Sequence, residues 1–159
     1  MDQREELDRL LREHPFFKDM SLELRQEIAD CAKSERYHAG EYIHREGEPA
    51  DRFYLIRHGS VAQELRIPEQ EPIIIQTLHA GDILGWSWLV PPYRWTADAR
   101  VIQLTRVVAL DARCLRGKYA DDPQLAYELL KRFIPIIANR LEASRLQLVD
   151  IYGEPRHRK

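Results

Sequence analysis

Residues 39–61 read A-G-E-Y-I-H-R-E-G-E-P-A-D-R-F-Y-L-I-R-H-G-S-V. Runs rich in β-branched and aromatic residues alternate here with turns at Gly40, Gly47 and Gly59. This alternation of strand-forming runs and turn residues predicts short strands joined by tight turns, and the same pattern continues to residue 111. We expect strands at residues 42–44, 53–57, 60–65, 73–78, 83–84, 96–101 and 105–111. Many short strands at such spacing favour a β-sandwich or β-roll.

Helical patterns flank the strands on both sides. Residues 4–14 place leucines at helical spacing and stop at Pro15, and Ser21 is a good N-cap for a second helix ending near Ser34. A last helix begins at Asp122 and Pro123 and continues to about residue 152. The pattern predicts a mainly β protein of one domain, residues 1–159. Its parts are N-terminal helices over 1–34, a β-roll (double-stranded β-helix or jelly roll) over 35–112 and a long helix over 121–153.

The last helix carries an apolar seam with a seven-residue repeat. Its members alternate four and three residues apart, and they are Leu130, Ile134, Ile137, Leu141, Ser144, Leu148 and Ile151. Such a seam usually faces another helix, most simply its own copy in a parallel homodimer. The alternative is a stripe buried within the same chain. Because Pro135 interrupts the helix, the part before it can lie on the roll while the later part leaves it.

A second stretch carries the functional question. Residues 81–98 read G-D-I-L-G-W-S-W-L-V-P-P-Y-R-W-T-A-D. The glycines allow the backbone to approach a ligand closely, and Arg94 offers an anion a planar fork of donors. All three tryptophans of the chain also fall here. The stretch can therefore grip an anion, stack a flat ring or fill its own cavity.

The order of helix, short strands, glycine-rich turn and long amphipathic helix resembles the cyclic nucleotide-binding domain family. This family includes catabolite activator protein-like regulators and protein kinase A regulatory subunits. The resemblance covers nearly the whole chain, and residues 39–61 are its strongest part, with Asp51 and Tyr54 among the glycines. These are scaffold positions, so they support the fold and not the ligand.

The resemblance implies that residues 81–98 are the family's phosphate-binding cassette. In the family a glutamate after a glycine binds the ribose, and an arginine pairs with the cyclic phosphate. Here Gly85 keeps the turn, but Trp86 stands at the glutamate position and Trp95 at the arginine position, with Thr96 at the hydroxyl position. Arg94 lies one residue early, and strand alternation prevents neighbours 94 and 95 from both pointing inward.

Two functions follow from these residues. The first is a regulatory sensor for a cyclic nucleotide (cAMP or cGMP) or for another small flat ligand, since tryptophan can stack such a ring. The second is a degenerate module that binds no ligand and serves dimerisation or protein interaction, its pocket closed by tryptophan. The candidate ligand-binding residues are Gly85, Trp86, Ser87, Trp88, Arg94, Trp95 and Thr96.

Composition and charge argue against several other classes of protein. The net charge of −2 provides no general basic surface for nucleic acid, and only a short basic tail follows Gly153, so we expect no DNA-binding domain. No apolar run approaches the length of a membrane span. Two cysteines are too few for a disulfide framework, and the histidines lack metal-ligand spacing. We therefore expect a cytoplasmic protein that is not an enzyme and holds no metal.

Overall fold

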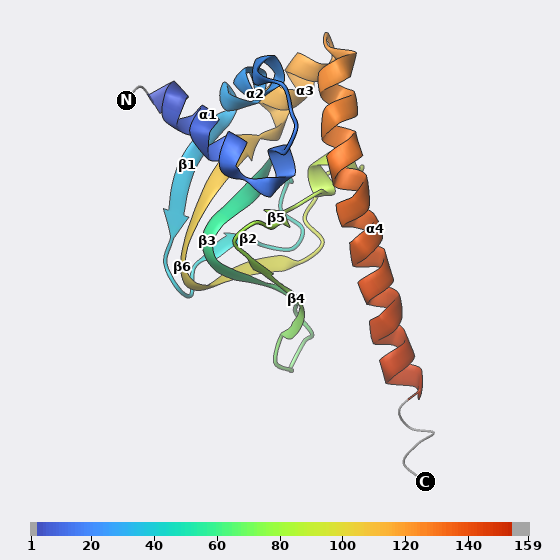
Figure 1. Ribbon diagram of the computed structural model, residues 1–159. Coiled ribbons are helices and arrows are strands. Elements are labelled where there is room, and N and C mark those ends of the chain that lie inside the picture. Colours follow the sequence, from blue (N-terminus) through green and yellow to red (C-terminus); the bar gives the residue numbers. More distant parts are fainter. Residues whose placement is uncertain (1–2, 154–159) are drawn as a thin grey trace.

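The computed structural model describes residues 3–153 as a rolled antiparallel sheet with helices at one end and along one side (Figure 1). This arrangement confirms the predicted fold class. In chain order the elements are α1 (Gln3–Glu13), η1 (Pro15–Phe17), α2 (Leu22–Ala29), β1 (Ala32–Tyr37), β2 (Tyr42–His44), β3 (Arg52–Leu65), β4 (Ile73–His79), β5 (Ile83–Leu84), η2 (Ser87–Leu89), β6 (Asp98–Asp111), α3 (Ala112–Tyr119) and α4 (Pro123–Gly153).

Two long strands form the spine of the sheet. β3 and β6 pair antiparallel, and the strand order is β1-β6-β3-β4, with β2 also pairing with β6 and β5 with β3. The sequence predicted each long strand as two short ones. The turn expected at Gly59 is instead an irregularity within β3, where the backbone has a φ of 101° and a Cβ would collide with Thr105.

The N-terminal boundary also differs from the sequence prediction. The second helix ends at Ala29, and the residues expected to complete it form β1 together with the start of the predicted roll. β1 pairs with β6 along its whole length, from Ala32 opposite Leu110 to Tyr37 opposite Thr105. Tertiary pairing therefore overrides the local helical spacing.

The core joins the roll to the helices through a cluster of aromatic rings. Phe53 from β3 stacks on Trp88 from η2, with ring centroids 5.0 Å apart. Phe133 from α4 meets both rings edge-on, at 5.1 Å and 5.5 Å, and also contacts Phe16 at 5.0 Å. The cassette turn, the roll and α4 therefore share one packed cluster.

The first part of α4 packs most closely on the roll. Its buried residues are Leu125, Leu129 and Phe133, all before Pro135. The later part continues beside the sheet, where Ile136 packs against the core and Gln147 Nε2 donates to Ile75 O of β4 at 3.3 Å (Figure 1). No described helix is long and apolar enough to cross a membrane. The basic C-terminal tail lies outside the described residues.

Candidate functional site

The glycine turn of the cassette is built as the sequence predicts, but its centre is filled. Gly85 follows β5 with a φ of 101°, which permits a sharp turn into η2. The indole of Trp95 lies directly over this glycine, so that a Cβ at position 85 would collide with the ring. The space beside the turn is thus occupied by a side chain of the protein itself.

Trp95 is held in this position from two sides. Its ring stacks on His44 of β2, with centroids 3.7 Å apart and planes inclined by 1°. Its backbone pairs with the turn after β2, because Trp95 N donates to Glu48 O at 2.9 Å and Trp95 O accepts from Gly47 N at 2.8 Å. Trp95 is 6% exposed, so the indole is a fixed part of the roll.

The neighbouring arginine lies outside the strands, in an isolated bridge with Pro49, and points outward. The guanidinium of Arg94 is exposed and donates to Gly47 O at 2.8 Å. This agrees with the expectation that residues 94 and 95 point to opposite faces. The structure therefore does not bring Arg94 into the site.

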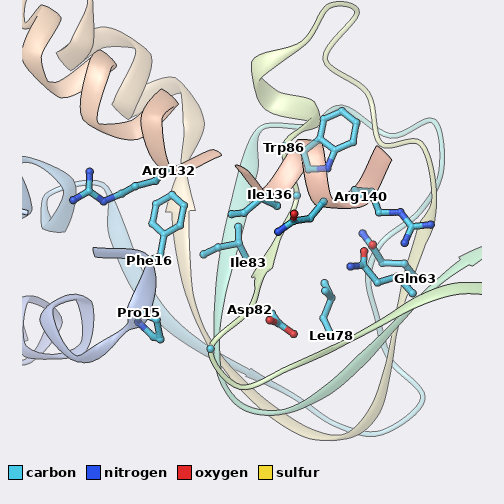
Figure 2. A pocket seen from close by; sticks show the side chains of 14 residues that line it. Pro15, Phe16, Gln63, Leu78, Asp82, Ile83, Trp86, Arg132, Ile136 and Arg140 are labelled. Carbon is cyan, nitrogen blue, oxygen red and sulfur yellow. The ribbon is translucent and has the colours of Figure 1, made fainter. Parts of the chain in front are cut away.

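Two cavities remain around the cassette. The larger, of about 430 Å³, lies between the roll and α4 (Figure 2). A smaller one of about 60 Å³ lies against the Trp95 ring, with room for a few water molecules. Gly85, Trp86, Gln63 and Arg140 line both.

The predicted ligand residues divide among these places. Gly85 and Trp86 line the larger cavity, whereas Ser87, Trp95 and Thr96 line only the smaller one. Trp88 lines neither, because it is wholly buried in the aromatic cluster. The reading of Trp88 as core, rather than as a stacking platform, is the one its position supports.

Sequence reasoning missed the wall of the larger cavity that α4 provides. α4 contributes Arg132, Ile136, Asn139 and Arg140, which lie on one face of the helix at positions i, i+4, i+7 and i+8. That spacing is readable in the sequence, but the apolar seam drew attention to another face. The remaining lining residues from the roll and η1 are Pro15, Phe16, Gln76, Leu78, Gly81, Asp82 and Ile83.

The charges of the larger cavity nearly cancel. Arg132 is paired with Glu128 and also donates to Lys18 O at 2.9 Å. Asp82 and Arg140 both line the cavity and carry opposite charges. Amides of Gln63, Gln76 and Asn139 provide neutral donors and acceptors. The lining therefore suits a polar ring more than a strongly charged group.

Burial keeps the His44 imidazole neutral. The ring is 5% exposed, and desolvation lowers its pKa to about 3, although Ala97 O and the charge of Asp98 oppose the shift. As the pH falls, His44 therefore becomes protonated near pH 6.5 in the unfolded chain but stays neutral at that pH in the folded chain. The contribution of His44 to stability is complete above pH 6.5 and is lost as the pH falls toward 3.

We expect the unfolding free energy to fall between pH 6.5 and pH 4.5 by up to about 1.4 kcal/mol per pH unit from this residue. Urea unfolding at several pH values measures the slope. A His44→Phe variant keeps a ring against Trp95 and removes the titration, so its slope should be smaller. Equal slopes in the two proteins would contradict the assignment.

Among the described residues, no group of three or more His, Cys, Asp or Glu side chains is arranged to hold a metal ion.

Comparison with known proteins agrees with this fold. The family model described as "Cyclic nucleotide-binding domain" matches residues 34–122. A CRP-like cAMP-activated global transcriptional regulator from Mycobacterium tuberculosis is 30% identical over 112 residues, which cover 70% of this chain and 48% of that protein. The chain thus spans about half the length of this relative.

Solved structures show the same fold. A cyclic nucleotide-binding domain from Methylobacillus flagellatus superposes with a TM-score of 0.75 at 22% identity, covering 92% of this chain and 82% of that one. The regulatory subunit of a cAMP-independent protein kinase A from Trypanosoma cruzi, bound to guanosine, gives a TM-score of 0.63 at 27% identity, covering 79% and 48%. With the family model matching more than half of its residues, the chain belongs to the cyclic nucleotide-binding domain family.

Proposed function

We propose that this chain is a regulatory sensor that binds a flat, uncharged, nucleoside-like molecule in the cavity between the roll and α4. The cyclic phosphate of the family's usual ligand has no place in this proposal. The module acts by binding, without catalysis, and transmits the state of the cavity through α4.

The position of the Trp95 ring is the main observation that supports this proposal. It lies over Gly85 and on His44, where a cyclic phosphate would need both space and a cation. Burying a phosphate there would displace the indole and leave the charge without an arginine. The larger cavity remains free beside it, and its volume of about 430 Å³ is in the range of small-molecule sites.

The chemistry of that cavity supports a flat polar ligand. Trp86 is half-buried at one side, with Asp82 and Leu78 across from it (Figure 2). An indole in this position can stack a heteroaromatic ring, and the amides can bond its edge. The T. cruzi relative bound to guanosine supports a nucleoside, whereas the name of the M. tuberculosis relative points to cAMP.

Titration of the Trp86→Ala variant with guanosine and adenosine tests the stacking role. Losing a stacked base costs about 1–3 kcal/mol, so affinity for the nucleoside that binds wild type should fall about 5- to 150-fold. Arg94→Ala is the matched control, because this exposed arginine lies outside both cavities and its removal should leave affinity unchanged. Equal losses in both variants would contradict the site.

The filled cassette also favours a second function, an interaction module that binds no ligand. Trp95 closes the turn, and α4 presents five strongly exposed apolar residues of the predicted seam: Leu130, Ile134, Leu141, Leu148 and Ile151. Ile137 and Ser144 of the same seam are half-buried. Absence of binding by guanosine, adenosine, cAMP and cGMP would favour this function over the sensor.

In either case we propose that α4 forms a homodimer through this seam. At about 100° per residue, the seam lies roughly a third of a turn around the helix from Ile136, Asn139 and Arg140, which face the cavity. One helix can therefore touch a ligand and a second copy at the same time. A ligand would then shift the dimer only as far as it prefers one arrangement of α4.

Sedimentation at micromolar concentration tests the dimer. We expect Leu141→Asp, in the centre of the seam, to give a monomer because a buried unpaired carboxylate would face the partner helix. Leu146→Asp is the matched control: Leu146 is 58% exposed and Leu141 62%, but residue 146 lies off the seam. A monomeric wild-type protein would refute this interface.

A further inference from the structure

Three arginines of this chain stand apart from all the others. Among residues 3–153, Arg36, Arg57 and Arg106 make no ion pair and no side-chain hydrogen bond, whereas every other arginine in this range makes at least one. The three come from different strands, β1, β3 and β6. Their lack of partners would be unremarkable if they were scattered over the surface, but they are not.

The register of the sheet places two of these arginines side by side, and Arg57 precedes the third residue of the row at an irregularity of β3. Arg36 of β1 is directly opposite Arg106 of β6, and Arg106 is in turn opposite His58 of β3. Residues opposite each other in antiparallel strands share one face of the sheet, and all three are exposed. Since strands lie about 4.8 Å apart, the row spans roughly 10 Å. Like charges directly opposite each other destabilise a sheet, so the fold gains nothing from this row.

One end of the row lines a groove of about 650 Å³, which shares only Pro15 and Gly81 with the cavity at α4. Arg57, His58 and Arg106 contribute its basic groups, and its one acidic residue, Glu13, is bound by Arg9 at 3.3 Å. Its other lining residues are mostly apolar: Leu10, Pro15, Ile56, Ala80, Gly81 and Leu104. Apolar walls with a few polar groups are typical of a small-molecule site.

A buried donor also lies at this groove. His14 lines it, is 5% exposed, and accepts a hydrogen bond from Phe16 N through Nδ1 at 3.2 Å. Burial lowers the pKa of His14, so the neutral ring carries its proton on Nε2. Nε2 makes no well-aligned hydrogen bond with the described residues, although the backbone of Ile56 and Asp82 and the charge of Asp82 lie near enough to oppose the fall in pKa. A buried polar group without a well-aligned partner is uncommon, and Nε2 is available as a donor at this groove.

We propose that this groove, formed by His14, Arg57, His58 and Arg106 with Arg36 beyond its rim, binds a small molecule that carries a diphosphate group. Arg57 and Arg106 each offer a free planar fork that matches phosphate oxygens. Two such cations in one groove suit two linked phosphoryl groups. Nothing in this proposal depends on the ligand of the other cavity.

Calorimetric titration of the full chain with sodium pyrophosphate at constant ionic strength tests the groove. We expect Arg57→Gln and Arg106→Gln each to weaken binding about tenfold or more, since hydrogen bonds between charged groups are the strong ones. Arg106→Lys keeps the positive charge but loses the planar fork of donors, so its affinity for pyrophosphate should lie between those of wild type and Arg106→Gln. Arg145→Gln, which removes an exposed arginine of α4, is the matched control and should bind as wild type.

Thermal unfolding of the same variants separates binding from folding. Because Arg106 faces Arg36 and His58, Arg106→Gln should melt no lower than wild type while it loses pyrophosphate. Equal weakening by Arg145→Gln, or no binding of pyrophosphate beyond that of inorganic phosphate, would overturn the proposal. Tighter binding of a hepta-glutamate peptide than of pyrophosphate would also overturn it and assign the groove to an acidic protein segment.

Discussion

Replacing Trp88 by alanine is expected to lower the unfolding free energy by about 3–5 kcal/mol. The indole is fully buried between Phe53 of β3 and Phe133 of α4, so its removal leaves a cavity where the cassette, the roll and the long helix meet. For a chain of 159 residues this corresponds to a melting temperature lower by about 6–20 °C. Calorimetric or urea unfolding measures the loss.

Two other variants sharpen this result. Trp86→Ala removes the same side chain two residues earlier, but from a half-buried position at the cavity, so it should cost much less. Trp88→Phe keeps a stacked ring and removes an indole N–H that has no described partner, so it should cost less than alanine. Equal losses for Trp86→Ala and Trp88→Ala would contradict the placement of Trp88 in the core.

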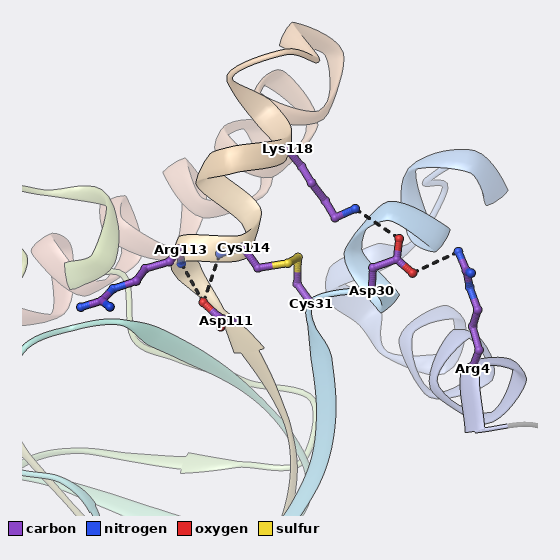
Figure 3. The surroundings of a disulfide bond; sticks show 7 residues. All are labelled: Arg4, Asp30, Cys31, Asp111, Arg113, Cys114 and Lys118. Atoms are coloured by element: carbon purple, nitrogen blue, oxygen red, sulfur yellow. Dashed lines mark hydrogen bonds and ion pairs between the residues drawn. A yellow bond between two sulfur atoms is a disulfide. The ribbon is translucent and has the colours of Figure 1, made fainter.

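Removing the disulfide is expected to have the second large effect. Cys31 before β1 and Cys114 in α3 are bonded, and 83 positions separate them (Figure 3). Closing a loop of this length restricts the unfolded chain by about 4–5 kcal/mol in the chain-entropy model, and native disulfides typically contribute about 2–5 kcal/mol. We expect Cys31→Ala with Cys114→Ala to lower the unfolding free energy by that amount.

Addition of dithiothreitol provides the control. It should destabilise wild type to the level of the double variant and leave the variant unchanged. An unchanged wild type in the presence of reductant, with free thiols absent in both conditions, would mean that the bond resists reduction; an unchanged double variant relative to wild type would contradict a stabilising role.

The disulfide works together with ion pairs at the same end of the molecule. Asp30 pairs with Lys118 of α3 at 3.2 Å and with Arg4 of α1 at 3.0 Å, beside the sulfur atoms (Figure 3). The side chain of Asp111 caps α3 by accepting from Arg113 N and Cys114 N. Structural disulfides persist mainly in oxidising compartments, so this bond does not fit the cytoplasmic location expected from the sequence.

The sequence predicted the roll because glycines mark the turns between its strands. It did not predict β1 or α3, for different reasons. β1 lies on an exposed face and lacks a regular apolar alternation, so only its pairing with β6 makes it a strand. α3 is a helix of eight residues with Gly117 inside it, too short for a periodic signal, and Asp111 was read as the end of a strand rather than as a cap.

The residues of the candidate site that are adjacent in the sequence were predictable. Those that reach it only through the packing of α4 on the roll were missed. Gly85 and Trp86 follow one another in the cassette, so the turn and its tryptophan could be found from the chain alone. Asn139 and Arg140 reach the cavity only because Phe133 anchors α4 on the roll. The expectation that Arg94 and Trp95 point to opposite faces agrees with the structure, although both residues lie before β6 and Arg94 is held there by Gly47 O and a bridge to Pro49.

Calorimetric titration of the wild-type protein with guanosine and with cGMP, under identical conditions, tests the central claim most directly. The two molecules share their base, and they differ in the cyclic phosphate that Trp95 leaves no room for. We predict that guanosine binds and that cGMP binds no more tightly. Binding of cGMP at least tenfold tighter than guanosine, or binding of neither, would contradict it.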